Sequence, residues 1–495
     1  MQRILGAIAL AAGATLAFST GALAQTAISI GDPYSGCTAD AGTGTNYASA
    51  EVEPRVSVSG SFAVAAWQQD RWSNGGAHGL VSAASTDGGS TWSEYPQPFS
   101  VCAQPFYRFQ VAQYNRASDP WVSIGPDGTV YSNAITFNGS NRQNGVFAAT
   151  SKDGLHWTNL VPLVQYITNG GQFSTDKNSI TADPDHAGVA YSVWDTLVSA
   201  TDEPDDNPRA FAYNGNGYFS KTTDGGKQWS APVVIFPTTE FTQTIGNVIV
   251  VDPRNDNLYD FAAWIVHPNS FANTQTFAAF VKSTDGGTTW SAPQQIAQMF
   301  SVGVTDPNTG ARIRTGNIIP EPAVDPTSGQ LYVVWQESSQ FKRGNVRGGE
   351  DDTVTLATSI DGGASWKLTS PVNTFTGLPA FTPTVQVDAG GRVAVTYYDF
   401  RNLSATNTTT LPTDYWITYS SNGGSIFAGE RHVGGSFNML AAANASGFFV
   451  GDYEGLAASG SGFLPVFGMT NCADNSCSLS NGGSDAQDIY TASGF

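Results

Sequence analysis

The chain has 495 residues, of which 13% are charged, and its formal net charge is -19. An acidic protein repels phosphate backbones and anionic lipid headgroups, so this balance argues against nucleic acid and membrane surfaces as partners. Gly, Trp, Tyr and Phe are frequent, which favours short strands and turns over surface helices. We therefore expect an all-β protein.

Residues 1–24 have the features of a signal peptide. Arg3 precedes an apolar stretch at 4–18, and small residues follow where a cleavage site is expected. The apolar stretch is shorter than the ~20 residues of a membrane-spanning helix, although a membrane anchor is the alternative. We predict a secreted protein, extracellular or periplasmic, whose residues 25–495 form a single domain.

A hairpin pattern follows along the chain: two apolar stretches separated by a turn with Gly or Asp. It predicts seven antiparallel hairpins. They occupy residues 56–67, 122–134, 180–194, 248–264, 323–335, 385–398 and 455–467.

A second motif lies between the hairpins, with the form hydroxyl residue, Asp, one or two glycines and an aromatic residue. Six copies occur, at 85–92, 151–157, 222–229, 283–290, 359–366 and, with Asn in place of Asp, 420–427. Asp followed by Gly is typical of a turn between two strands, because the Asp side chain accepts hydrogen bonds from turn amides. We call these segments the Asp turns and expect them to be structural.

One hairpin and one Asp turn together supply four strands, and four-stranded sheets arranged radially form a β-propeller. Seven hairpins predict seven blades. The last blade lacks an Asp turn, so we expect it to take a third strand from 488–493 and its outer strand from 26–30, which closes the ring. A six-bladed propeller with one additional hairpin is the alternative.

Four cysteines in an exported chain favour two disulfides over a metal site. We predict a Cys37–Cys102 disulfide, because these residues follow the outer strands of the closing blade and of the first blade. Cys472 and Cys477 would close a short loop.

The starts of the innermost strands and the ends of the second strands share one face of a propeller, opposite the Asp turns. The charged and polar residues expected there are Glu53, Arg55, Asp70, Arg71, His78, Arg116, Asp119, Asp176, Lys177, Asp195, His267, Arg314, Glu321, Glu337, Asp399, Arg401, Asp452, Tyr453 and Glu454. Several arginines on one face of an acidic protein indicate recognition of a carboxylate or similar anion. The alternative is that each arginine pairs with a neighbouring acid.

The repeated S-x-D-G-G-x-T-W turns resemble those of the sialidase superfamily, also called Asp-box or BNR-repeat proteins. The stretch "FAVAAWQQDRWSNGGAHG" (62–79) also resembles the sialidase segment in which an Arg ends the second strand and a loop with the acid/base Asp follows. The resemblance implies a secreted glycoside hydrolase of exo-α-sialidase type. In that mechanism arginines hold the substrate carboxylate, an Asp handles the proton, and a Tyr activated by a Glu attacks the sugar.

Carried over to this chain, the resemblance gives each candidate a role. Tyr453 is the expected nucleophile, Glu321 or Glu454 its base, and Asp70 the acid. His78 stands about where the sialidase acid is expected, and "VEPRV" displaces Arg55 past the proline of the family's Arg-Ile-Pro opening. The expected anion contacts are Arg71, Arg314 and Arg401, with Arg55 and Arg116 nearby.

Two other functions fit the same residues. A polysaccharide lyase acting on uronates would use the arginines to neutralise a carboxylate and His78 or Tyr453 as base. A non-catalytic propeller that binds carbohydrate or protein is the other. We expect a monomer acting on an acidic glycan without a required cofactor, with calcium possible at the acidic loops 201–209 and 348–353.

Overall fold

The computed structural model describes residues 25–107, 110–168, 172–199, 212–239, 241–267, 274–338, 351–477 and 486–495. The predicted signal peptide and the acidic loop 201–209 lie outside the described residues, as does part of 348–353. The described residues form strands and the short 3-10 helices η1 (Val101–Ala103) and η3 (Met439–Ala441), so the predicted all-β fold is confirmed. No helix in these ranges has the length and hydropathy that a membrane crossing requires.

The strands follow one another in antiparallel units of four. Unit 1 contains β3 (Val52–Ser59), β4 (Phe62–Trp72), β5 (Ala77–Ser85) and β6 (Ser93–Pro96). Unit 2 contains β7 (Arg116–Ile124), β8 (Val130–Phe137), β9 (Asn144–Ser151) and β10 (Trp157–Tyr166). Unit 3 contains β11 (Phe173–Ala182), β12 (Ala190–Ser199), β13 (Ala212–Thr222) and β14 (Val233–Phe236). Unit 4 contains β15 (Thr242–Asp252), β16 (Asn257–Val266), β17 (Gln275–Ser283) and β18 (Gln294–Met299).

The second half of the chain continues the pattern. Unit 5 contains β21 (Glu321–Val324), β22 (Leu331–Ser338), β23 (Asp352–Ser359) and β24 (Lys367–Thr369). Unit 6 contains β25 (Ala380–Val387), β26 (Val393–Asp399), β27 (Pro412–Ser420) and β28 (Ala428–Asn438). Unit 7 contains β29 (Gly455–Ser459), β30 (Gly462–Thr470), β31 (Gln487–Ala492) and the N-terminal β1 (Gln25–Ala27). The remaining strands are β2 (Asn46–Tyr47), which pairs with β4, and the hairpin of β19 (Val304–Thr305) and β20 (Arg312–Ile313).

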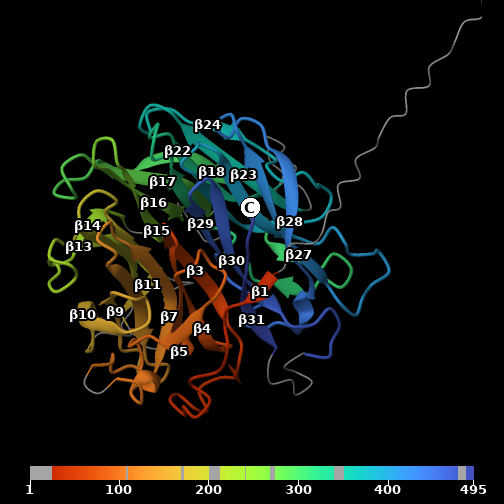
Figure 1. The fold of residues 1–495 in the computed structure, drawn as a ribbon, viewed down its shortest axis with the longest axis horizontal. Coiled ribbons are helices and arrows are strands. Elements are labelled where there is room, and N and C mark those ends of the chain that lie inside the picture. The colour runs from red at the N-terminus through yellow and green to blue at the C-terminus, as the bar shows by residue number, and fades with distance from the viewer. Residues whose placement is uncertain are drawn as a thin grey trace, which may run out of the picture.

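The units follow one another around the molecule in chain order, as the colours of Figure 1 show from red through green to blue. The first strand of each unit packs against the first strand of the next, and β29 of unit 7 packs against β3 of unit 1. Apolar side chains fill the space between neighbouring units; Val64 of unit 1, for example, lies in one cluster with Val122 and Ala149 of unit 2. The first strands therefore lie next to one another, where they can surround a shared site.

The N-terminal strand lies in the sheet where the sequence predicts it. β1 pairs antiparallel with β31, and the amide of Ile28 continues this pairing by donating to the carbonyl of Ile489 at 2.8 Å. The strand is shorter than the predicted 26–30, because the amide of Ile30 donates to Glu94 of unit 1 at 2.7 Å. The chain thus leaves unit 7 for unit 1 at this point.

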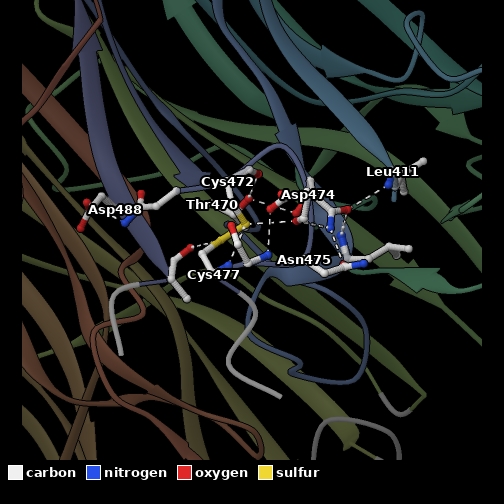
Figure 2. Close-up of a disulfide and its surroundings, with 12 residues drawn as sticks. Leu411, Thr470, Cys472, Asp474, Asn475, Cys477 and Asp488 are labelled. Carbon is white, nitrogen blue, oxygen red and sulfur yellow. Dashed lines mark hydrogen bonds between the residues drawn. A yellow bond between two sulfur atoms is a disulfide. The ribbon is translucent and has the colours of Figure 1, made fainter. Parts of the chain in front are cut away.

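Both predicted disulfides are present, Cys37–Cys102 and Cys472–Cys477. The second, between the labelled Cys472 and Cys477 of Figure 2, closes a loop after β30. This loop contacts unit 6, because Asn438 of β28 donates through its side-chain amide to the carbonyl of Asp474 at 2.8 Å. The first joins the segment after β1 to the segment after β6. One disulfide thus links the segment that follows the outer strand of unit 7 to unit 1, and the other constrains a loop of unit 7 that contacts unit 6.

The Asp turns connect the third and fourth strands of units 1 to 6, as predicted. Asp285 is typical: one carboxylate oxygen accepts from the amides of Thr288 and Thr289 at 3.1 and 2.8 Å, and the other accepts from the Thr289 hydroxyl at 2.6 Å. The Ser283 hydroxyl donates to the same carboxylate at 2.9 Å. The repeated Asp thus organises the turn that joins two strands.

A second feature recurs on the opposite side of the units. The first strands of units 1, 2, 3, 4 and 6 each carry one extra residue relative to the second strand at the same position. The residue at the bulge has a positive φ in each case; these residues are Glu53, Asp119, Lys177, Gly246 and Thr382. A bulge re-aims side chains, and left-handed non-glycine residues concentrate at functional sites.

Candidate functional site

A large cavity of about 1060 Å³ opens on the face that bears the bulges. It is lined by residues 73–75, 116, 137–139, 142, 144, 174–175, 245, 302–305, 312–319, 446 and 452. These residues belong to the first four units, to the 300–319 segment between units 4 and 5, and to the segment before β29. We call this space the outer cavity.

A smaller cavity of about 150 Å³ adjoins the outer cavity, and we call it the inner cavity. The two share Ile245, Arg314, Ile319 and Asp452 as lining residues. The other lining residues of the inner cavity are Glu53, Arg71, Gly76, Ser118, Asp119, Asp176, Lys177, Leu197 and Gln243. Three bulge residues and two arginines therefore meet in a space of about the size of one sugar ring.

Glu53 lies at the bulge of β3 and is 2% exposed. The side-chain amide of Gln68 donates to one of its carboxyl oxygens. Burial, with the negative charges of Asp119 and Asp452, raises the pKa of Glu53 to about 8. Glu53 therefore carries a proton at neutral pH and can donate it to a bound molecule.

Asp452 is held in the opposite protonation state. The guanidinium of Arg314 donates two hydrogen bonds to its carboxylate. Burial acts to raise the pKa of Asp452, but the charge and hydrogen bonds of Arg314 outweigh burial and the pKa is lowered. Asp452 is thus a carboxylate whose negative charge favours retention of the proton on Glu53.

Two cations of the inner cavity have no carboxylate partner in the part of the chain that the structure describes. Arg71, at the end of β4, donates to the side-chain oxygen of Gln68 and the carbonyl of Gly76, while its buried Nε makes no hydrogen bond. Lys177 is 3% exposed and its ammonium has no hydrogen-bond partner; it lies 3.5 Å from the ring centre of Tyr453. Burial and the nearby charge of Arg314 lower the pKa of Arg71 to about 10. An anion placed between these groups would gain charge-assisted hydrogen bonds.

Tyr453, the expected nucleophile, lies behind the inner cavity and does not line it. Its ring packs against Trp121, with 5.5 Å between ring centres, and its hydroxyl faces the carbonyl of Pro120 at 3.4 Å. Burial raises the pKa of Tyr453 well above its usual range, and the charges of Glu53 and Asp119 add to this effect. In this arrangement the face of the Tyr453 ring makes a cation–π contact with the Lys177 ammonium.

The two glutamates expected to activate Tyr453 have other partners. Glu321 accepts from Arg55 at 2.8 Å, so this predicted anion contact pairs with an acid of β21. Glu454 accepts from the amide of Gly468 at 3.0 Å, and burial raises its pKa well above the usual range. None of the three lines either cavity.

Asp70 and His78 form a separate buried pair beside the N-terminal segment. The Nδ1 atom of His78 lies 3.0 Å from a carboxylate oxygen of Asp70, and the ring of His78 packs edge-on against Trp72. Neither residue lines the inner or the outer cavity. Their expected part in proton transfer stays a prediction from the resemblance.

Of the two remaining predicted arginines, one lines a cavity and the other does not. Arg116 lines the outer cavity, but it is almost fully buried and pairs with Asp40 at 2.8 Å. Arg401 pairs with Asp399 and with Glu430 at 2.6 Å, stacks on Trp416 at 3.6 Å, and lines neither cavity. The structure therefore brings together Arg71 and Arg314, and it places Arg401 elsewhere on unit 6.

Glu53, Asp119, Lys177 and Asp452 were expected on this face but received no role from the sequence. The sequence does contain one indication of two of them: an acid directly precedes a proline at the start of a first strand, in Glu53-Pro54 and Asp119-Pro120. Proline lacks the amide that the strand ladder needs, which is compatible with a bulge. No residue pattern marks Lys177, because its neighbours contain no proline.

In the described part of the chain, no group of three or more His, Cys, Asp or Glu side chains has the arrangement of a metal site. Calcium binding at the acidic loops stays a prediction, because these loops lie wholly or partly outside that part.

Residues 218–429 match the family described as BNR repeat-like domain. The match includes the Asp turns at 222–229, 283–290, 359–366 and 420–427, and it confirms the predicted resemblance over that part of the chain. A search among curated proteins gave no match.

Solved structures with a similar fold include sialidases, an arabinanase and a polysaccharide lyase. The Hadza microbial sialidase Hz136 is 13% identical to this chain; the alignment covers 77% of this chain and 66% of the sialidase chain, with a TM-score of 0.42. The α-L-arabinanase of Penicillium chrysogenum is 14% identical over 71% and 93% of the two chains, with a TM-score of 0.43. An ulvan lyase of polysaccharide lyase family PL25 is 12% identical over 90% and 95%, with a TM-score of 0.49.

Proposed function

We propose that the seven units are the blades of one β-propeller that the N-terminal strand closes. The cyclic packing of the first strands, from β3 through β29 and back to β3, supports this architecture. The pairing of β1 with β31 supports the closure. The two disulfides also fit an exported protein, since disulfides persist in oxidising compartments.

We propose that the protein is a secreted glycoside hydrolase that acts on an acidic sugar held in the inner cavity. One observation carries this proposal: Asp119 and the protonated Glu53 line one small cavity together with two cations, Arg71 and Lys177, that have no carboxylate partner among the described residues. A pair of carboxyl groups is the usual equipment of a glycosidase. The two cations supply the contact for an acidic substituent.

The reaction follows from these positions. Glu53 donates its proton to the glycosidic oxygen as the bond between that oxygen and the anomeric carbon breaks. The Asp119 carboxylate stabilises the positive charge that develops at the anomeric carbon. Water then adds to this carbon and gives up a proton, which restores Glu53. Arg71 and Lys177 hold the acidic substituent during both steps.

An exo-sialidase is the more specific form of this proposal, in line with the resemblance of the Asp turns. The hydroxyl of Tyr453 is buried, which gives little support to its part as nucleophile. Asp70 lines neither cavity, so we assign the proton transfer to Glu53 in its place. A uronate lyase is the second candidate. The observation that favours it is the same pair of cations, which would neutralise a uronate carboxylate and acidify the adjacent C–H bond.

The test is to screen the mature protein against sialosides and uronate-capped glycans, with reducing sugar and unsaturated products recorded side by side. We expect release of a saturated acidic sugar by the wild type and little release by Glu53→Gln. Glu337→Gln is the matched control, because Glu337 also has a raised pKa, about 7 owing chiefly to burial, yet lines neither cavity. Unsaturated products would assign the site to a lyase, and cleavage of neutral glycans alone would refute an acidic substrate.

A further inference from the structure

The 300–319 segment forms one wall of the outer cavity. Its β19–β20 hairpin is fixed to the segment before β29: the amide of Arg314 donates to the carbonyl of Phe448, and the amide of Phe448 donates to the carbonyl of Arg312, both at 3.0 Å. The side-chain amide of Asn308 also donates to two carbonyls of the loop between β26 and β27. The wall is therefore held in place by units 6 and 7 as well as by its own ends.

Arg312 projects from this wall, and its side chain is exposed and lines the outer cavity. This side chain makes no hydrogen bond or ion pair with any residue that the structure describes. Each other arginine in the described ranges makes a polar, ionic or ring contact. In a protein of net charge -19, a cation with free donors at a cavity mouth is a contact for an external anion.

The size of the outer cavity indicates what carries that anion. The inner cavity, at about 150 Å³, has room for one sugar residue, whereas the outer cavity, at about 1060 Å³, has room for several. The wall also offers apolar surface for the C–H faces of sugars: Val302 is 44% exposed, Ile318 is partly exposed, and both line the cavity. A single terminal sugar would leave this space and Arg312 unused.

We propose that the outer cavity is a second anion subsite, in which Arg312 binds the carboxylate or sulfate of a further acidic sugar of the same oligosaccharide. The substrate is then an oligosaccharide with acidic groups on more than one residue. This inference rests on the proposed function, because it assumes that the inner cavity holds an acidic sugar.

The experiment uses calorimetry to measure the affinity of the mature protein for two kinds of probe. One kind is the monosaccharides N-acetylneuraminate and galacturonate; the other is tetragalacturonate and a chondroitin sulfate tetrasaccharide. We expect Arg312→Ala to weaken binding of a tetrasaccharide about 5- to 10-fold, as for one charge-assisted hydrogen-bonded contact, and to leave monosaccharide binding unchanged. Arg312→Lys should retain most of the affinity. The matched control is Lys227→Ala, which removes an exposed cation from an Asp turn on the opposite face.

Unchanged tetrasaccharide affinity in Arg312→Ala would overturn the subsite, while monosaccharide binding that depends on Arg71 would leave the proposed function standing. If the wild type binds none of the four probes, the acidic substrate and the subsite both fail. A loss in Lys227→Ala equal to that in Arg312→Ala would also overturn the subsite, because it would show a general effect of net charge.

Discussion

Asp285 of the Asp turns and Glu53 of the inner cavity have opposite protonation behaviour. Asp285 is exposed and accepts from the Thr289 hydroxyl and two turn amides; these hydrogen bonds lower its pKa to about 2. Glu53 is buried beside two other acids, and its pKa is raised to about 8. An exposed carboxyl group that accepts several hydrogen bonds stays ionised and shapes the backbone, whereas one that is buried beside other acids holds a proton.

The two regions also differ in how they use repetition. The Asp turns keep nearly the same residues in six units, because each must form the same turn. The bulge has the same backbone form in five units, yet the residue there is Glu53, Asp119, Lys177, Gly246 or Thr382. A shared backbone position with different side chains is how a repeating fold builds a site that does not repeat.

The substitution with the largest expected effect on activity is Glu53→Gln. It keeps the shape of the side chain and removes the proton donor, so we expect the turnover number to fall about 10²- to 10⁴-fold with little loss of stability. Turnover and melting temperature measured on the same preparation check this. Near-normal turnover in a folded variant would remove Glu53 from the reaction.

The next prediction concerns stability against pH. Because the pKa of Glu53 is raised in the folded state, the folded protein binds its proton more tightly than the unfolded chain does, and this contribution is lost as pH rises from about 4.5 to about 8. Relative to Glu53→Gln, the wild type should lose stability on the order of a few kcal/mol over this range. Urea unfolding of both proteins at pH 5 and pH 8 measures the difference. Parallel pH profiles would contradict the raised pKa.

A third prediction separates two arginines that the sequence groups together. Arg71→Ala should weaken binding of an anionic glycan by about 1.5 to 3 kcal/mol, because a buried donor that faces the cavity is lost. Arg401→Ala should bind normally, since Arg401 pairs with Asp399 and Glu430 and lines neither cavity. Equal losses in both variants would place the anion outside the inner cavity.

The smallest effect is expected at the Asp turns. Asp285→Ala removes the acceptor of two amides and two hydroxyls, so the melting temperature should fall by a few degrees while ligand affinity stays unchanged. Calorimetric melting and ligand titration of this variant check both parts. A folded Asp285→Ala protein without affinity would mean that the functional face has been assigned to the wrong side.

The sequence predicts the fold well because each repeat contains the residues that form its own turns and strands. Asp-Gly turns, paired apolar stretches and cysteine positions led to the seven hairpins, the turns between third and fourth strands, both disulfides and the pairing of the N-terminal strand with residues near 490. The hairpins and turns depend on short stretches of chain, which the sequence shows directly. The Cys37–Cys102 disulfide and the pairing of the N-terminal strand join distant residues, and they follow from the order of the repeats.

The site was less predictable, because it depends on contacts between distant residues. The sequence predicts that Arg401 and His78 lie at the ends of strands on the side opposite the Asp turns, but only the packing shows that Asp399, Glu430 and Asp70 engage them. Likewise, Tyr453 follows Asp452 in the chain, yet Asp452 lines both cavities while Tyr453 packs behind them against Trp121. The bulge at Glu53 decides which acid enters the cavity, and a bulge is a matter of strand register.

The most direct test of this account is the protonation state of Glu53. Infrared difference spectra between the wild type and Glu53→Gln report the carbonyl band of a protonated carboxylic acid, and they require no substrate. We expect a band present at neutral pH that disappears with a midpoint near pH 8. A midpoint near the ordinary value of 4.5 would show that Glu53 is ionised at neutral pH, and it would contradict the proposed proton donor.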